Sequence, residues 1–175
     1  MSEKFLLDAN AFIEPRDRYY AYDICPGYWT TLVSQHNEDR VCSLDRIRDE
    51  LIPKKQDDWD DIAHWIDEKV PTTFFKKTED QAVIDLFGEM VQWVYSEPQY
   101  YDTAKSEFAS VADGWIVAYA AINGLTVVTH EQYSPDAKKR VMIPNVCMEY
   151  DVKCVDTFAM LRTLGAKFIS STKHG

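Results

Sequence analysis

Short apolar runs that end in polar residues alternate along the chain with longer segments of helical periodicity. Residues 4–8 (KFLLD), 41–43, 125–129 (LTVVT) and 152–155 form four such runs, and residues 73–75 form a weaker fifth. Runs of this length and composition suit strands that are buried in a parallel sheet. Parallel strands need long crossovers, and helical segments stand in those positions. The sequence therefore predicts an α/β fold, a three-layer α/β/α sandwich with a central parallel sheet of four to five strands.

The spacing of apolar residues between the strands predicts the helices. We expect helices over residues 27–36, 44–52, 59–66, 78–95, 113–123 and 157–164. Residues 113–123 (DGWIVAYAAIN) are apolar almost all round, so this helix should be buried. Thr78 and Gln81 have the spacing of a capping box at the start of the longest helix. Residues 15–28 and 98–110 are rich in Tyr, and we expect loops or short helices there.

The composition indicates a globular chain with one core. Of its 175 residues, 46% are hydrophobic and 13% are aromatic, which is enough to bury a core without cross-links. We expect a single domain over residues 1–170 and a flexible C-terminal tail over residues 171–175. No apolar run is long enough to cross a membrane, and the first residues lack the features of a signal peptide. A cytoplasmic location is therefore expected, with no membrane partner.

The four cysteines favour reduced thiols over a disulfide or a zinc site. Cys25, Cys42, Cys147 and Cys154 include no C-x-x-C pair, and no His lies at zinc-ligand spacing from them. Free and mostly buried thiols are typical of a cytosolic protein.

The net charge of −10 argues against general binding of nucleic acid, because Lys and Arg lead the binding of phosphate groups. A local cluster of carboxylates that binds metal would also make the chain acidic. A surface that docks a basic partner would have the same effect. The sequence leaves both explanations open.

Four acids lie where predicted strands end or where neighbouring helices carry them. Asp8 ends the first strand, and Glu131 follows the strand at 125–129. Asp113 opens the buried helix before that strand, and Glu50 lies on the helix after the second strand. In open parallel sheets the active site lies at the carboxyl ends of the strands. The 18 positions from Asp113 to Glu131 fit one helix, a turn and a strand, which returns both residues to the same edge of the sheet.

Each acid taken alone has an ordinary structural explanation. Asp8 suits a helix N-cap, and Asp113 with Ser110 fits a capping pattern. Glu50 suits a solvated helix face, and Glu131 suits an exposed loop. The functional interpretation therefore depends on the four residues as a set.

In this order along the chain, the four acids and their surroundings resemble the PIN-domain nucleases, especially the VapC-type ribonuclease toxins of bacterial toxin–antitoxin systems. The matching stretches are LLDANAFI at 6–13, SLDRIRDEL at 43–51, VADGWIVAYAAINGLTVVTHE at 111–131 and VKCVDTFAML at 152–161. Asp8 with Asn10 two positions later matches the first motif of the family. Two positions depart from the pattern. Glu131 stands where the family commonly has Asp, and Asp49 is a second candidate beside Glu50.

The resemblance implies a PIN-like fold and a divalent-metal-dependent endoribonuclease, with RNA as substrate and an antitoxin protein as partner. Asp8 and Asp113 would bind Mg²⁺ or Mn²⁺ directly, as one ion or two, and Glu50 and Glu131 would complete the site or act through water. Cleavage would leave a 5′-phosphate and a 3′-hydroxyl. The resemblance is also compatible with a homodimer.

Polar residues beside the acids are candidates for supporting roles. Asn10 and Thr129 would donate hydrogen bonds that orient the metal ligands. The candidate phosphate contacts are Arg16, Arg18, Lys54, Lys55, Lys138, Lys139 and Arg140. Residues 138–140 follow Glu131 closely, so they are expected at the rim of the pocket. The candidate base-stacking residues are Tyr19, Tyr20, Tyr100 and Tyr101. The ordinary alternatives are solvated charges and packing aromatics.

Two other functions are open on the sequence alone. A haloacid-dehalogenase-like phosphatase also begins with a strand that ends in Asp, but it needs an acid two positions later, where Asn10 stands. A non-catalytic PIN-like module that binds RNA or protein would keep the fold without a working set of acids. No Gly-rich phosphate loop is present, which argues against a nucleotide-binding Rossmann-like or flavodoxin-like domain.

Overall fold

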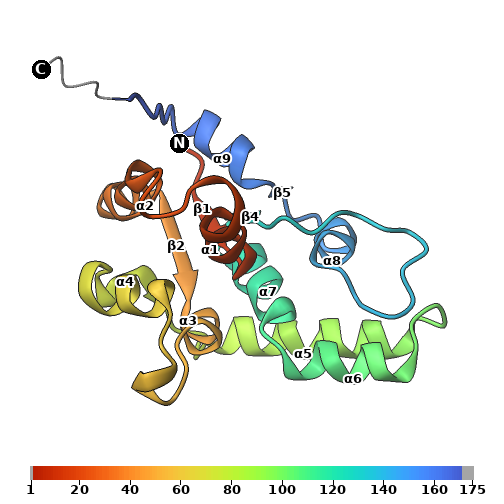
Figure 1. The fold of residues 1–175 in the computed structure, drawn as a ribbon. Coiled ribbons are helices and arrows are strands. Elements are labelled where there is room, and N and C mark those ends of the chain that lie inside the picture. The colour runs from red at the N-terminus through yellow and green to blue at the C-terminus, as the bar shows by residue number, and fades with distance from the viewer. Residues whose placement is uncertain (1, 171–175) are drawn as a thin grey trace, which may run out of the picture.

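Five parallel strands form one sheet in the computed structural model, which describes residues 2–170 (Figure 1). They are β1 (Phe5–Leu7), β2 (Val41–Leu44), β3 (Phe75–Lys76), β4 (Thr126–Val128) and β5 (Cys154–Val155). The strand order is β3-β2-β1-β4-β5, so β1 lies at the centre. Phe5 pairs with Val41 on one side and with Thr126 on the other. The predicted α/β class with a central parallel sheet is confirmed.

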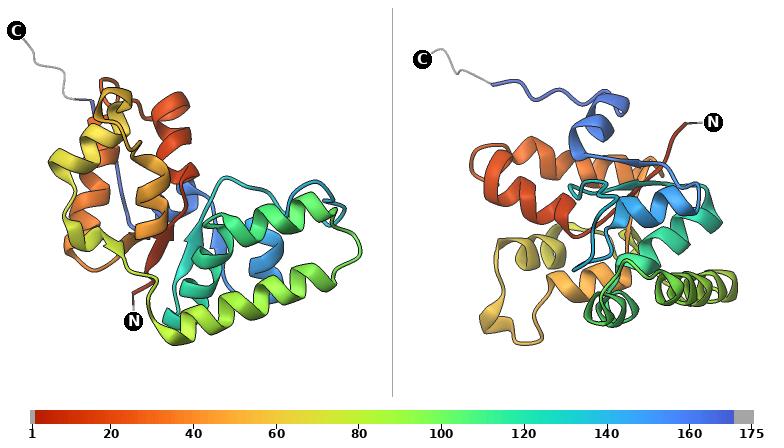
Figure 2. Two further views of the ribbon diagram at one scale, coloured as in Figure 1. Left: turned by 90° about the horizontal axis from the view of Figure 1, so that it is seen from below. Right: turned by 90° about the vertical axis from the view of Figure 1, so that its right-hand side faces the viewer.

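Helices cover both faces of this sheet. Those that the structure describes are α1 (Asn10–Glu14), α2 (Pro26–Asn37), α3 (Asp45–Leu51), α4 (Asp61–Lys69), α5 (Gln81–Ser96), α6 (Asp102–Ser110), α7 (Asp113–Asn123), α8 (Ile143–Glu149) and α9 (Thr157–Thr163). Figure 2 shows α1 and α2 on one side of the sheet and the α5–α6 pair with α7 on the other. The predicted three-layer arrangement is therefore confirmed.

The core explains why the central strand is apolar throughout. Phe5, Leu6 and Leu7 are all fully buried, because helices cover both faces of β1. Helix α7 packs closely against α5 and α6 at Gly114, where an added Cβ would lie 2.7 Å from the Phe108 ring and 2.8 Å from the Phe87 ring. A larger side chain would not fit at this crossing without movement of the two rings.

Two predicted details of the helix and strand boundaries are wrong. Thr78 and Gln81 do not form a capping box, because Asp80 caps α5 by accepting a hydrogen bond of 2.9 Å from Ala82 N. The Thr78 hydroxyl instead contacts Asp45, at 3.2 Å. The predicted strand at 73–75 begins at Phe75, since residues Thr72–Phe74 form a 3₁₀ turn.

Short helices occupy the segments for which the sequence predicted loops or short helices. A π-helical turn runs over Pro15–Tyr19, and α6 covers the end of the second segment. Helices α1 and α8 were not predicted. No helix within residues 2–170 is long and apolar enough to cross a membrane. The predicted tail at 171–175 lies outside the described residues.

Candidate active site

Asp8 directly follows the central strand and is almost entirely buried. The residue is only 3% exposed. Its Oδ2 accepts hydrogen bonds from Thr129 Oγ1 at 2.9 Å and from Asn10 Nδ2 at 3.3 Å. Asp8 is not the N-cap of α1, because Ala9 holds that position without a side-chain cap. Burial, together with the charges of Asp113 and Glu131, raises the pKa of the Asp8 carboxyl to about 7.

Asp113 is the first residue of α7, and its side chain is 13% exposed. Its Oδ2 lies 3.2 Å from Nη2 of Arg140. Burial raises the pKa of the Asp113 carboxyl, and the Arg140 guanidinium opposes this rise. Ser110 does not cap the helix, because its hydroxyl donates to the carbonyl of Glu107. Asp113 thus has an ion pair in place of the capping role that the spacing also allowed.

Glu131 lies in the segment after β4 and is held between the start of α8 and Arg140. Its Oε2 accepts a hydrogen bond of 2.7 Å from Ile143 N, and its Oε1 lies 2.7 Å from Arg140 Nη2. The Glu131 side chain is 6% exposed, and burial raises its pKa. The Glu131 N–H donates to Thr129 Oγ1 at 3.2 Å. One threonine hydroxyl therefore connects Glu131 to Asp8.

Glu50, rather than Asp49, reaches the start of α7. Its Oε1 accepts a hydrogen bond of 3.3 Å from Ala112 N, the residue before Asp113. Asp49 instead lines a surface depression with Arg46 and Trp115. Burial raises the pKa of the Glu50 carboxyl, and the charge of Asp113 adds to the rise.

The four predicted acids thus share one electrostatic environment at the carboxyl ends of the strands. Burial raises the pKa of Asp8, Glu50 and Glu131, and the charge of Asp113 raises each of them further. Their donor atoms are all carboxylate oxygens, which suit Mg²⁺ and Mn²⁺. As arranged within residues 2–170, no three or more His, Cys, Asp or Glu side chains stand in a group that could hold a metal ion. The positive charge of Arg140 opposes the rise in pKa of three of these acids, namely Glu50, Asp113 and Glu131.

Two residues near the acids were not found by sequence reasoning. Glu107 on α6 adds a negative charge that raises the pKa of Asp113 and Glu131. Asn145 on α8 fixes the segment after Glu131, since it accepts from Ser134 N at 3.0 Å and donates to Ser134 O at 2.7 Å. Neither stands in a recognisable motif, because Glu107 acts through its charge and Asn145 acts through hydrogen bonds to the backbone of Ser134.

The other candidate RNA contacts lie in varied surroundings. Arg16 forms ion pairs with Asp17 and Asp60, and Arg18 lies 3.0 Å from Glu14. Lys138 and Lys139 are exposed next to Arg140.

Of the tyrosines proposed to stack on bases, two are available and two are packed. Tyr19 and Tyr101 are exposed, although Tyr19 also contacts Phe158 edge-on. Tyr100 is buried, and Tyr20 stacks on Tyr28. Only the first pair could stack on a base without rearrangement.

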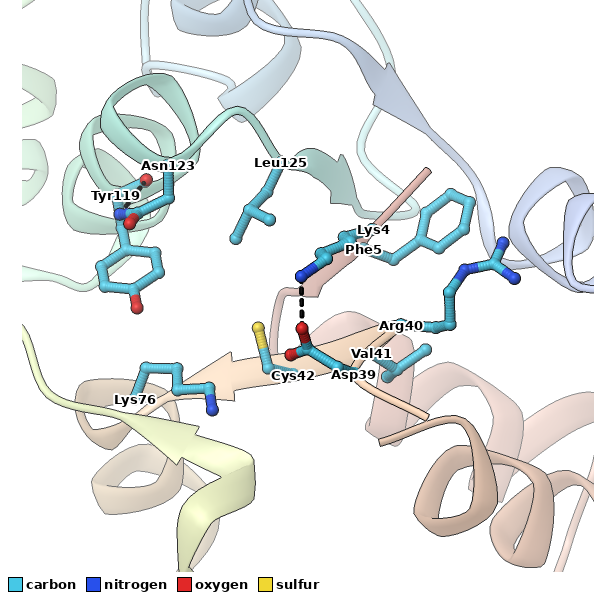
Figure 3. Close-up of a pocket in the computed structure, with 10 residues that line it drawn as sticks. All are labelled: Lys4, Phe5, Asp39, Arg40, Val41, Cys42, Lys76, Tyr119, Asn123 and Leu125. Atoms are coloured by element: carbon cyan, nitrogen blue, oxygen red, sulfur yellow. Dashed lines mark hydrogen bonds and ion pairs between the residues drawn. The ribbon is translucent and has the colours of Figure 1, made fainter. Parts of the chain in front are cut away.

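A separate cavity lies toward the opposite, amino ends of the strands (Figure 3). Lys4 and Asp39 form an ion pair there, and Cys42 is one of its walls. Burial raises the pKa of the Cys42 thiol to about 11, so this sulfur stays protonated near neutral pH. None of the acids predicted as metal ligands lines this cavity. All four cysteines are free thiols.

Comparisons with known proteins add a family and a fold. A family model described as "Domain of unknown function (DUF4411)" matches residues 5–168. No curated protein matches the chain. Among solved structures, the crystal structure of FitAcB from Neisseria gonorrhoeae is similar, with 19% sequence identity and a TM-score of 0.50. The match covers 86% of this chain and 95% of that chain. This likeness supports the PIN-like fold that the sequence predicted.

Proposed function

The chain belongs to the DUF4411 family, a domain of unknown function, and we propose that it is a divalent-metal-dependent endoribonuclease. The observation that supports the proposal most strongly is the burial of Asp8, a residue that is 3% exposed at the end of the central strand. Its environment includes the charges of two further acids, Asp113 and Glu131. Grouping negative charges in a buried position is unfavourable unless a cation binds there or one of the carboxyl groups takes up a proton. Carboxylate oxygens are the kind of ligand that a hard divalent ion prefers.

In this proposal each residue of the acidic cluster has a role. Asp8 and Asp113 bind Mg²⁺ or Mn²⁺, and Glu50 and Glu131 bind the ion directly or through water. Thr129 and Asn10 hold Asp8 in place through the hydrogen bonds to its Oδ2. When bound, the divalent ion makes water a better nucleophile and stabilises negative charge on the phosphate.

RNA is the proposed substrate because the PIN-like fold and the order of the acids match ribonucleases of that fold. Lys138 and Lys139 are exposed, lie a few residues after Glu131 in the sequence, and would contact the phosphate backbone. The chain as a whole is acidic, with a net charge of −10, so we expect weak, salt-sensitive binding outside the pocket. We further propose that the protein is a cytoplasmic toxin neutralised by an antitoxin protein.

A cleavage assay tests this function. Purified wild-type protein is incubated with an end-labelled single-stranded RNA in Mn²⁺, in Mg²⁺ and in EDTA, beside the Asp8→Asn and Asp113→Asn variants. We expect metal-dependent products with 5′-phosphate and 3′-hydroxyl ends from wild type, and none from either variant. Asp49→Asn is the matched control, because this neighbouring acid faces a different depression and should leave cleavage intact. Cleavage that persists in EDTA or in both variants would contradict the proposal.

A PIN-like module that binds RNA or protein without catalysis is the second candidate. The observation that favours it is the ion pairing of Arg140 with Asp113 and Glu131, which neutralises part of the cluster without metal. This candidate predicts RNA retention without cleavage and a melting temperature that Mn²⁺ does not raise. The nuclease proposal predicts a rise that Asp8→Asn abolishes.

A further inference from the structure

Arg140 places one guanidinium nitrogen between two acids of the pocket. Its Nη2 lies 3.2 Å from Asp113 Oδ2 and 2.7 Å from Glu131 Oε1. These side chains are 13% and 6% exposed, so the two carboxylates are close to fully buried. A nearby positive charge favours the ionised form of both carboxylates in such a buried pair. Arg140 supplies that charge at the position where the carboxylates converge.

The contact with Glu131 is not a well-formed hydrogen bond. Glu131 Oε1 is a buried oxygen without a hydrogen-bond partner among the described residues, although Arg140 Nη2 is 2.7 Å away. Its other oxygen, Oε2, is satisfied by Ile143 N. A buried carboxylate oxygen that lacks a directional partner retains the capacity to bind a cation at that position. The Arg140 guanidinium therefore balances the charge of Glu131 but leaves its Oε1 without a hydrogen bond.

The backbone around Arg140 is anchored, whereas its side chain is half exposed to solvent. Tyr101 N donates to Lys138 O at 2.9 Å, and the next residue after Arg140, Val141, is buried. The Arg140 side chain is 49% exposed. Half-exposed side chains change rotamer rapidly, without movement of the backbone. The guanidinium can thus leave the acids by rotation toward solvent while the segment after β4 stays in place.

We propose that Arg140 is an internal counter-cation that competes with the divalent ion for Asp113 and Glu131, and so sets the metal affinity of the pocket. The inference rests on the proposed function, since it concerns the ion that the same acids would bind. It assigns to Arg140 a role at the carboxylates, in addition to the phosphate contact expected from the sequence. A bound ion and the paired guanidinium exclude each other at Glu131 Oε1.

Titration of Mn²⁺ by calorimetry, on metal-free protein at constant pH and salt, tests this role. Removing Arg140 as a competitor in Arg140→Gln should tighten Mn²⁺ binding by about three- to tenfold, because two partly exposed ion pairs no longer have to break. Lys139→Gln is the matched control, since it removes the same charge from the adjacent exposed residue. It should change the affinity by less than about twofold. Unchanged or weaker binding in Arg140→Gln would overturn the proposal.

Chemical rescue provides a second readout. In Arg140→Ala, millimolar guanidinium chloride should weaken Mn²⁺ binding again, while the same concentration of NaCl should not. Equal effects of the two salts would also count against the proposal. If Arg140→Gln does not fold, Arg140→Ala and Arg140→Lys are used in its place. Arg140→Lys keeps the charge, so its Mn²⁺ affinity should stay near that of wild type.

The outcomes separate this inference from the proposed function. If wild type binds Mn²⁺ in a manner lost in Asp8→Asn, and Arg140→Gln binds it no more tightly, only the role of Arg140 fails. If neither wild type nor Arg140→Gln binds Mn²⁺, the metal site itself fails and the inference with it. If Arg140→Gln binds Mn²⁺ and wild type does not, the Arg140 guanidinium blocks the ion completely, which would support the proposal.

Discussion

The Thr129 hydroxyl donates a hydrogen bond of 2.9 Å to Asp8 Oδ2 and thereby joins the residues that follow two adjacent strands, β1 and β4. Thr129 Oγ1 in turn accepts a hydrogen bond from the N–H of Glu131 at 3.2 Å. Thr129 thus holds an acid from the centre of the sheet and an acid from the next segment in one arrangement. Position at the carboxyl ends of the strands brings the acids near each other, and this hydroxyl orients one of them.

Replacing Thr129 with Val should weaken the pocket and the fold together. The variant keeps the shape of the side chain but leaves Asp8 and Glu131 N without this partner, which should cost about 1–3 kcal/mol of unfolding free energy. Mn²⁺ affinity should fall by about tenfold or more, because the oriented ligand is lost. Thr126→Val is the matched control at the other end of β4, where the hydroxyl donates to Glu3. It should lower stability without changing Mn²⁺ affinity, and an equal loss of affinity in both variants would contradict the role of Thr129.

The raised pKa of Asp8 predicts how the metal-free protein responds to pH. The folded pKa of about 7 exceeds the ordinary Asp value of 3.8, so the folded state holds the Asp8 proton more tightly than the unfolded state. Stability from this group is therefore fully present below pH about 4 and is lost as pH rises toward 7, by at most about 4 kcal/mol. Asp8→Asn should remove this part of the dependence, so the variant should exceed wild type in stability above pH 7. Urea unfolding in EDTA at several pH values measures the difference; parallel curves for the two proteins would disprove the pKa assignment.

Gly114→Ala should destabilise the fold at the crossing of α7 with α5 and α6. The new Cβ would lie 2.7 Å from the Phe108 ring and 2.8 Å from the Phe87 ring, and overpacking of this kind costs about 1–3 kcal/mol. Gly88→Ala is the control, because α5 has open space around Gly88. Removing a helical glycine there should raise stability by up to about 1 kcal/mol. Urea unfolding measures both changes. A change of the unfolding free energy in the same direction in both variants would contradict the close packing of α7 at Gly114.

Expression in bacteria tests the toxin proposal. Wild-type protein should arrest growth and degrade cellular RNA, and Asp8→Asn or Asp113→Asn should relieve both effects at equal protein levels. Asp49→Asn should arrest growth like wild type, since Asp49 lines a different depression. Normal growth and intact RNA during wild-type expression would count against a toxin.

The strands and the buried helix could be predicted because their signal is local. The run FLL of β1 is apolar throughout because both of its faces are covered, and α7 has the same bounds in the sequence pattern and in the structure. Helix α8 gave no such signal, since it is short. The capping box at Thr78 was wrong because Asp80 satisfies the helix end equally well, while Thr78 contacts Asp45 in another segment. Local sequence does not decide between two such caps.

In the candidate site, too, features with a local sequence signal could be predicted, and features that depend on contacts between segments could not. The four acids could be selected because each stands at a strand end or on an adjoining helix. The choice between Glu50 and Asp49 depends on the rotation of α3, which the hydrogen bond from Ala112 N identifies. The ion pairs of Arg140 could not be predicted, since they depend on the path of an irregular segment. Contacts between distant segments, rather than local patterns, determine this part of the pocket.

A crystal structure of the protein grown with Mn²⁺, with anomalous diffraction used to locate the ion, tests the central claim most directly. We expect an anomalous peak at coordination distance, about 2.0–2.6 Å, from carboxylate oxygens of Asp8 and Asp113. The Arg140 guanidinium should then be turned away from Glu131 toward solvent. A map without a peak in this pocket, and with Arg140 still between Asp113 and Glu131, would contradict the account.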